Sequence, residues 1–119
     1  MKTSLIKDKS FEFALSIIQL YKTLQQNKEF IISKQLLRSG TGIGANVSEA
    51  LAGESRADFL HKMAIASKEA RETIYWLELL DKSNLVNNNY QKHIEDCMSI
   101  VKILTAIVHT TKSNLKSKT

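Results

Sequence analysis

The segment "QLLRSGTGIGANVSEA", residues 35–50, contains three of the four glycines in the chain. Gly40, Gly42 and Ala45 fit the G-x-G-x-x-G/A pattern of a loop that holds the phosphates of a dinucleotide. That chemistry needs a strand before the glycines, a helix after them and a parallel sheet around both. The residues before the glycines do not form a convincing strand pattern, and no Gly-Lys-Ser/Thr follows them as it would in a P-loop. The sequence therefore does not predict a nucleotide-binding loop.

A second candidate chemistry is acid–base catalysis by paired charged side chains. Arg38 and Glu49 lie on the glycine segment, and Glu72 lies farther along the chain. A buried carboxyl group beside an arginine has a shifted pKa that suits proton transfer. Such groups more often form a structural ion pair, so we expect Arg38 to pair with Glu49 or Glu72 and assign no catalytic residue. A buried polar pocket around Glu49 and Arg71 would instead favour a small-molecule enzyme.

The residues that most often bind metals are scattered. His61, His93 and His109 match neither H-E-x-x-H nor the Glu-x-x-His pairs of di-iron bundles. Cys97 falls on an apolar helical stripe, which predicts a core residue rather than a reactive thiol. We therefore predict no metal ion and no cofactor.

Composition limits the classes of protein to consider. The chain has 119 residues, 43% of them hydrophobic, no proline and a formal net charge of +5. This length predicts one domain. No apolar run approaches the length of a membrane span, and the first ten residues lack the apolar core of a signal peptide. With a single cysteine, these features predict a soluble cytoplasmic protein without a membrane partner.

Apolar residues recur every three or four positions along most of the chain, which predicts helices. In the second segment this period continues through the glycines. Gly53 is expected to end that helix in a left-handed conformation, and Ser55 to cap the next one. The predicted helices cover residues 10–26, 31–52, 56–82 and 90–112, followed by a frayed basic tail. Residues 1–119 are thus predicted to form one all-α domain, an up-down-up-down antiparallel four-helix bundle.

The first predicted helix has two apolar stripes. One contains Phe11, Ala14, Leu15, Ile18, Tyr21 and Leu24, and the second contains Phe13, Ile17 and Leu20. One buried face does not need both stripes. Two interpretations remain open: a deeply buried helix, or a helix whose second stripe is buried against another subunit.

Glycine inside a helix needs a physical reason. Each one costs about 1 kcal/mol relative to alanine. Gly40 and Gly44 lie four residues apart and therefore share one helix face. We expect this small surface to permit a close helix contact, with Tyr75 or Trp76 of the third helix as the natural partner.

The excess of basic residues permits binding to nucleic acid through phosphates. The candidate residues lie outside the predicted core stripes, and they are Lys34, Arg38, Arg56, Lys62, Lys68 and Arg71. The sequence contains no recognition-helix pattern, so such binding would have weak sequence selectivity. An ordinary solvated surface is the alternative interpretation of the same residues.

The glycine segment, followed by "DFLHKMAIASKEARETIYWLELL", resembles the 23S rRNA intervening-sequence (S23-type) proteins, which are small four-helix bundles. The resemblance extends over nearly the whole chain. It suggests structural roles for six motif positions of the second helix, which are Gln35, Arg38, Gly40, Gly44, Asn46 and Glu49. The family often has serine or alanine at the position of Gly42.

This resemblance also implies a function. The family is similar to the accessory proteins of diversity-generating retroelements, which are pentamers with a basic surface that bind a reverse transcriptase and nucleic acid. It implies a homo-oligomer, most simply a pentamer, that acts as a scaffold or adaptor for RNA, DNA or a nucleic-acid enzyme, and it implies no catalysis. A purely structural or protein-binding oligomer without affinity for nucleic acid remains the alternative.

Overall fold

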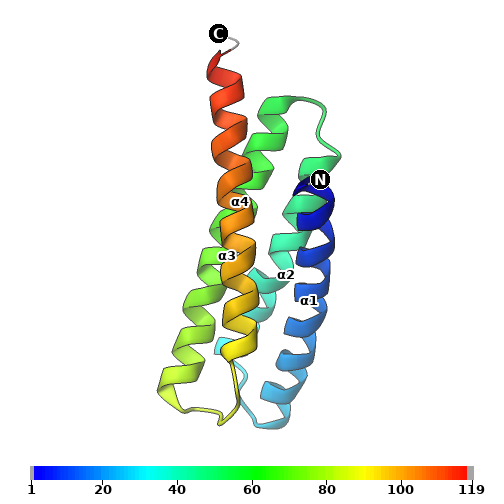
Figure 1. The fold of residues 1–119 in the computed structure, drawn as a ribbon. Coiled ribbons are helices and arrows are strands. Elements are labelled where there is room, and N and C mark those ends of the chain that lie inside the picture. Colours follow the sequence, from blue (N-terminus) through cyan, green and yellow to red (C-terminus); the bar gives the residue numbers. More distant parts are fainter. Residues whose placement is uncertain (1, 118–119) are drawn as a thin grey trace.

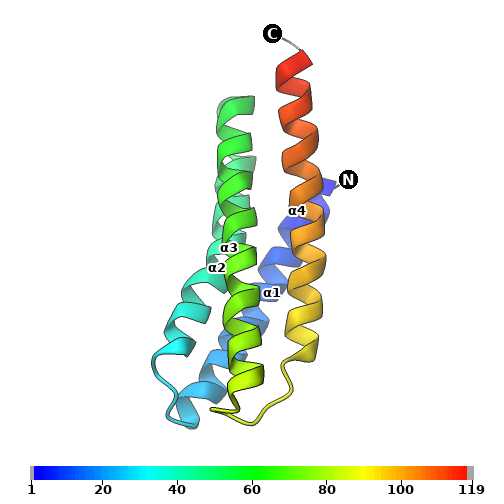
Figure 2. The same cartoon turned by 90° about the vertical axis from the view of Figure 1, so that its left-hand side faces the viewer.

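The computed structural model describes residues 2–117, which form four helices: α1 (Lys2–Gln26), α2 (Ile32–Leu51), α3 (Arg56–Ser83) and α4 (Gln91–Ser117). Successive helices run in opposite directions, and both chain ends lie toward the same end of the molecule (Figures 1 and 2). Within the described residues each helix packs against two others, in the order α1–α2–α3–α4 and back to α1. The predicted all-α antiparallel four-helix bundle is confirmed.

The helix ends confirm one predicted local signal and contradict another. The Ser55 hydroxyl accepts a hydrogen bond from the Asp58 backbone N–H at 3.0 Å, so the predicted cap of α3 is confirmed. Gly53 does not have a positive φ, and the expected left-handed end of α2 is wrong. Instead, the Gly53 N–H donates to the Ala50 carbonyl at 3.1 Å. The left-handed residues follow α1 and α3 instead: Lys28 with φ 63° and Asn84 with φ 58°.

Glu29 supplies a cap for α2 that the sequence pattern did not indicate. Its carboxylate accepts backbone N–H groups from Ile31, Ile32 and Ser33 at 2.6 to 3.1 Å. Burial raises the pKa of Glu29, but these hydrogen bonds outweigh burial and hold the pKa below its ordinary value. The otherwise unpaired N–H groups of the first turn are thereby satisfied.

Two helices are longer than predicted. Helix α1 begins at Lys2 rather than near residue 10, and α4 continues to Ser117 rather than ending near residue 112. Residues 112–117 of the predicted frayed tail are therefore helical, and residues 118–119 lie outside the described part of the chain. Both extensions are lysine-rich segments with no helix breaker, and the α1 extension also contains Ile6, which joins the core.

The positions of the two α1 stripes contradict the expectation that the second stripe is buried against another subunit. The stripe predicted to be buried between subunits forms the core of this chain: Ile17 has no exposed surface, and Phe13 and Leu20 are almost fully buried. The other stripe is largely outside, with Phe11 62% and Leu15 45% exposed. The core stripe also begins earlier, at Ile6, because α1 begins earlier.

On α4, the packing decides which residues of the apolar period face the core. Met98 and Thr105 lie on the outside of α4, while Ile100, Ile107 and Thr111 are buried. None of the four helices in the described part of the chain combines the length and hydropathy needed to cross a bilayer.

Candidate functional site

The glycine segment lies wholly within α2, so its backbone N–H groups are engaged along a helix and do not form a phosphate loop. A Cβ on Gly40 would lie 2.9 Å from Ile17 Cγ2, and one on Gly44 would lie 3.3 Å from the Ser10 carbonyl oxygen. Both glycines therefore face α1. The expected close helix contact exists, but the expected partners Tyr75 and Trp76 of α3 are wrong.

Arg38 joins α2 to α3. Its guanidinium donates to the carboxylates of Glu72 and, at 3.4 Å, Glu69. The Trp76 indole N–H donates to the same Glu72 carboxylate at 2.9 Å. The expected pairing of Arg38 with Glu72 is confirmed. Two carboxylates beside Arg38 leave this predicted phosphate-binding residue with little charge to offer an anion.

The remaining motif positions also make contacts within the chain. Gln35 accepts a hydrogen bond from Arg38 at 3.4 Å. The Asn46 side chain donates to the Gly42 carbonyl at 2.9 Å. Glu49 pairs with Lys62 of α3 at 3.3 Å rather than with Arg38. The first two contacts lie within α2, and the Glu49 pair joins α2 to α3.

Two of the predicted nucleic-acid-binding residues on α3 also have local partners. Lys62 is paired with Glu49. The Arg56 guanidinium lies 4.8 Å from the centre of the Phe59 ring, in a cation–π contact. Lys34 is exposed on α2. The structure does not gather these side chains into one patch with Arg38.

Arg71 instead lies on a basic surface between α3 and α4. Its guanidinium donates to the Thr105 hydroxyl of α4 at 3.2 Å. A shallow groove of about 190 Å³ begins at this contact, and its lining residues are Ser67, Arg71, Thr105, Val108, His109 and Lys112. Lys68 and Lys102 are exposed on the outward sides of the same two helices. We call Lys68, Arg71, Lys102, His109 and Lys112 the basic face.

No carboxylate interrupts α4 along the basic face. The last acidic residue of this helix is Asp96, and residues 97–117 contain neither aspartate nor glutamate. Lys102 and Lys112 are ten residues apart, which places them about 15 Å apart along the helix axis. Sequence reasoning found Lys68 and Arg71 but missed the residues on α4. The signal that could have found them is the acid-free stretch itself.

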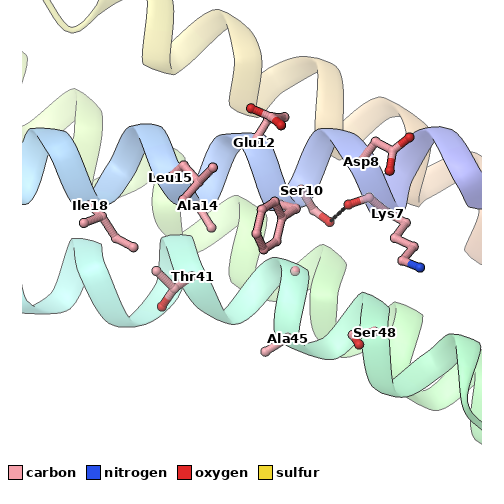
Figure 3. Close-up of a pocket in the computed structure, with 12 residues that line it drawn as sticks. Lys7, Asp8, Ser10, Glu12, Ala14, Leu15, Ile18, Thr41, Ala45 and Ser48 are labelled. Carbon is pink, nitrogen blue, oxygen red and sulfur yellow. Dashed lines mark hydrogen bonds between the residues drawn. The ribbon is translucent and has the colours of Figure 1, made fainter.

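The opposite edge of the bundle, between α1 and α2, carries an apolar groove of about 580 Å³. Its α1 side contains the exposed residues Phe11, Leu15 and Ile18. Figure 3 shows Ile18 near Thr41 of α2, with the small residues Ala45 and Ser48 farther along the same helix. Its charged rim consists of Lys7, Asp8 and Glu12. We call this surface the apolar groove.

The buried titratable groups do not assemble a reaction centre. The Cys97 thiol donates to the Ala70 carbonyl at 3.2 Å, and burial raises its pKa to about 12, as expected for a core cysteine. Burial lowers the pKa of His93, the backbone of Ser16 opposes this shift, and the His93 Nδ1 lacks a hydrogen-bond partner. Among residues 2–117, no three histidine, cysteine or carboxylate side chains gather as metal ligands would.

Glu49 and Arg71 do not form the buried polar pocket that would favour a small-molecule enzyme. Glu49 lies on α2 with its side chain 62% exposed beside Lys62. Arg71 contacts α4 on another side of α3. The two side chains are therefore directed to different neighbours and do not share a pocket.

The comparisons with known proteins agree with this fold. Residues 2–106 match the family described as 23S rRNA-intervening sequence protein. A similar crystal structure is that of a protein with unknown function from the S23 ribosomal protein family of Bacteroides thetaiotaomicron VPI-5482. It is 50% identical, with a TM-score of 0.87 over 92% of this chain and 99% of that one. No curated protein matches the sequence. The chain therefore belongs to the 23S rRNA-intervening sequence protein family.

Proposed function

We propose that this protein is a non-enzymatic scaffold that assembles with copies of itself through the apolar groove and binds nucleic acid through the basic face. One observation carries the proposal: the two surfaces lie on opposite edges of one bundle. Helices α1 and α2 form one edge and α3 and α4 the other, since the helices pack in a closed ring. Both surfaces are therefore free to act at the same time.

The apolar groove supports self-assembly by its shape and by its charges. Large exposed side chains on α1 stand beside a floor of small residues on α2, so another helix can approach closely. The rim carries both signs of charge, Lys7 against Asp8 and Glu12, which suits ion pairs with a different surface of the next copy, as a closed ring requires. We propose a pentamer as the size of the assembly, following the resemblance to retroelement accessory proteins.

Self-assembly is tested by sedimentation of the Leu15→Lys variant. The new charge would enter the apolar groove without touching the core, so we expect monomers with wild-type helix content. Gln19→Lys is the matched control, because Gln19 is exposed on α1 and does not line the groove. A wild-type protein that is monomeric at all concentrations, or a Leu15→Lys variant with unchanged mass, would contradict the proposal.

The basic face supports binding to phosphates. Its cations project from two adjacent helices, and α4 supplies no carboxylate to neutralise them. Repetition of this face around an oligomer would multiply the phosphate contacts and raise the affinity through avidity. Base edges are not addressed by such a surface, so binding is expected to be weakly sequence-selective.

The test is fluorescence anisotropy with labelled RNA and DNA at low and near-physiological salt. We expect micromolar or tighter binding that weakens steeply with salt. The Arg71→Gln/Lys112→Gln double variant should reduce the slope of log affinity against log salt by about 1.4 to 1.8. The Lys22→Gln/Lys34→Gln variant removes the same charge from exposed positions on α1 and α2 and should leave affinity nearly unchanged. Equal effects of the two variants would mean that binding depends on net charge alone and not on the basic face.

Absence of binding at low salt would favour the alternative function, an oligomer that binds proteins only. The exposed apolar side chains of α1 are the observation that supports this alternative. In that case, the sedimentation experiment would still test self-assembly through the apolar groove.

A further inference from the structure

An exposed aromatic ring lies at one end of the basic face. Tyr75 of α3 is 58% exposed, although a tyrosine side chain is large and partly apolar. It follows Arg71 by four residues, which places it one helical turn away on the same side of α3. The ring therefore shares the outward surface of α3 with the cations.

Cations of α3 lie on the same side as this ring. Arg71 is one turn before Tyr75 and Lys68 is two turns before it, so all three project from one side of α3. The Arg71 guanidinium also donates to the Thr105 hydroxyl of α4 at 3.2 Å, where the groove of the basic face begins. The tyrosine ring therefore continues a row of cations along α3.

The ring is also held in place. Tyr75 packs edge-on against Trp76, with ring centres 5.0 Å apart and ring planes at 74°. Trp76 is itself anchored by its hydrogen bond to Glu72, which Arg38 holds from α2. An aromatic ring that is exposed and already ordered loses little conformational entropy when a ligand stacks on it.

We propose that Tyr75 is a stacking platform for an unpaired base, so that the basic face prefers single-stranded nucleic acid to a duplex. This inference rests on the proposed binding of phosphates by the same face. Proteins that bind single strands combine a cationic track for the backbone with aromatic rings on which bases stack. The bases of a duplex are stacked on one another and cannot lie on Tyr75 without being unpaired.

The experiment compares one labelled 12-nucleotide RNA, alone and annealed to its complement, for wild-type protein and two variants. Tyr75→Leu removes the ring but keeps an apolar side chain, and we expect about tenfold weaker binding to the single strand with duplex binding unchanged. Tyr75→Phe keeps the ring and should bind the single strand within about twofold of wild type. The phenylalanine variant thus separates stacking from the hydroxyl group.

A second readout comes from the single tryptophan of the chain, Trp76, which touches the Tyr75 ring. We expect its fluorescence to change on addition of the single strand and to change much less with the duplex. Equal wild-type affinity for the two RNAs, or equal loss of both in Tyr75→Leu, would overturn the stacking platform while leaving phosphate binding intact. Failure of wild-type protein to bind either RNA at low salt would overturn the proposed nucleic-acid binding as well.

Discussion

The two edges of the bundle present opposite kinds of surface on the same helical architecture. On the α1–α2 edge, small side chains on α2 leave apolar residues of α1 uncovered. On the α3–α4 edge, long cationic side chains surround a shallow groove. Apolar surface favours association with a matching surface, whereas cationic surface stays solvated until it meets an anion. A regular helical period hides this difference, because the difference lies in the outward residues of each helix.

The largest predicted effect separates the inside of the α1–α2 edge from its outside. Ile17→Ala should lower the free energy of unfolding by about 2–5 kcal/mol, because Ile17 is fully buried. Ile18→Ala, one residue away on the exposed stripe, should change it by less than about 1 kcal/mol when the protein is dilute. Urea denaturation at several protein concentrations measures both. If Ile18 takes part in assembly, the effect of Ile18→Ala on the free energy of unfolding should grow with protein concentration. Equal effects of the two variants in dilute protein would contradict the division into a buried and an exposed stripe.

A smaller effect separates the two faces of α2. Gly40→Ala should destabilise the protein by about 1–2 kcal/mol, because the new methyl group would collide with the branched side chain of Ile17. A methyl carbon added at Gly42 would lie 3.0 Å from Glu69 Oε2, which is the end of a flexible side chain. Gly42→Ala should therefore be neutral or stabilising, by up to about 1 kcal/mol from helix propensity. Thermal melting of both variants tests the difference, and a more damaging Gly42→Ala would place the tight contact on α3 instead.

The smallest predicted effect concerns the seam where α4 meets α1 and joins the two edges. Burial is the main cause that holds the pKa of His93 below its ordinary value of 6.5, while Asp96, Lys92 and the Ser16 carbonyl modify it. The unfolded chain therefore takes up the proton first as pH falls, and stability should decline below about pH 6.5. The decline should be modest because His93 keeps partial contact with solvent. Urea midpoints at pH 7.5 and 5.5 should differ less for His93→Gln than for wild type; an identical difference would contradict this role.

Much of the fold was predictable because each helix carries its own local signals. The apolar period identified four helices, and Ser55 marked the start of α3. Charge and helix order predicted Glu49 or Glu72 as the partner of Arg38, and the structure has Glu72 in that place. These features depend on residues close in sequence or on the simplest antiparallel arrangement of neighbours.

The errors about packing share one physical origin, which is the choice between two neighbouring helices. Both stripes of α1 have helical spacing, and only the packing of α2 and α4 decides that Ile17 is inside and Leu15 outside. In the same way, Gly40 could face either α1 or α3 until the rotation of α2 is known. The sequence indicated only half of the basic face, because Lys112 becomes part of it only when α4 packs beside Arg71. A single-helix pattern does not specify which helix lies opposite.

The order of helix packing has a consequence for the rate of folding. Three of the four helix contacts join segments that are adjacent in the chain, and only α1 with α4 joins distant ones. Chains dominated by such local contacts fold in microseconds to milliseconds, because little loop-closure entropy is lost before each contact forms. We expect the three hairpin-like contacts to form first and the seam between α1 and α4 to close last.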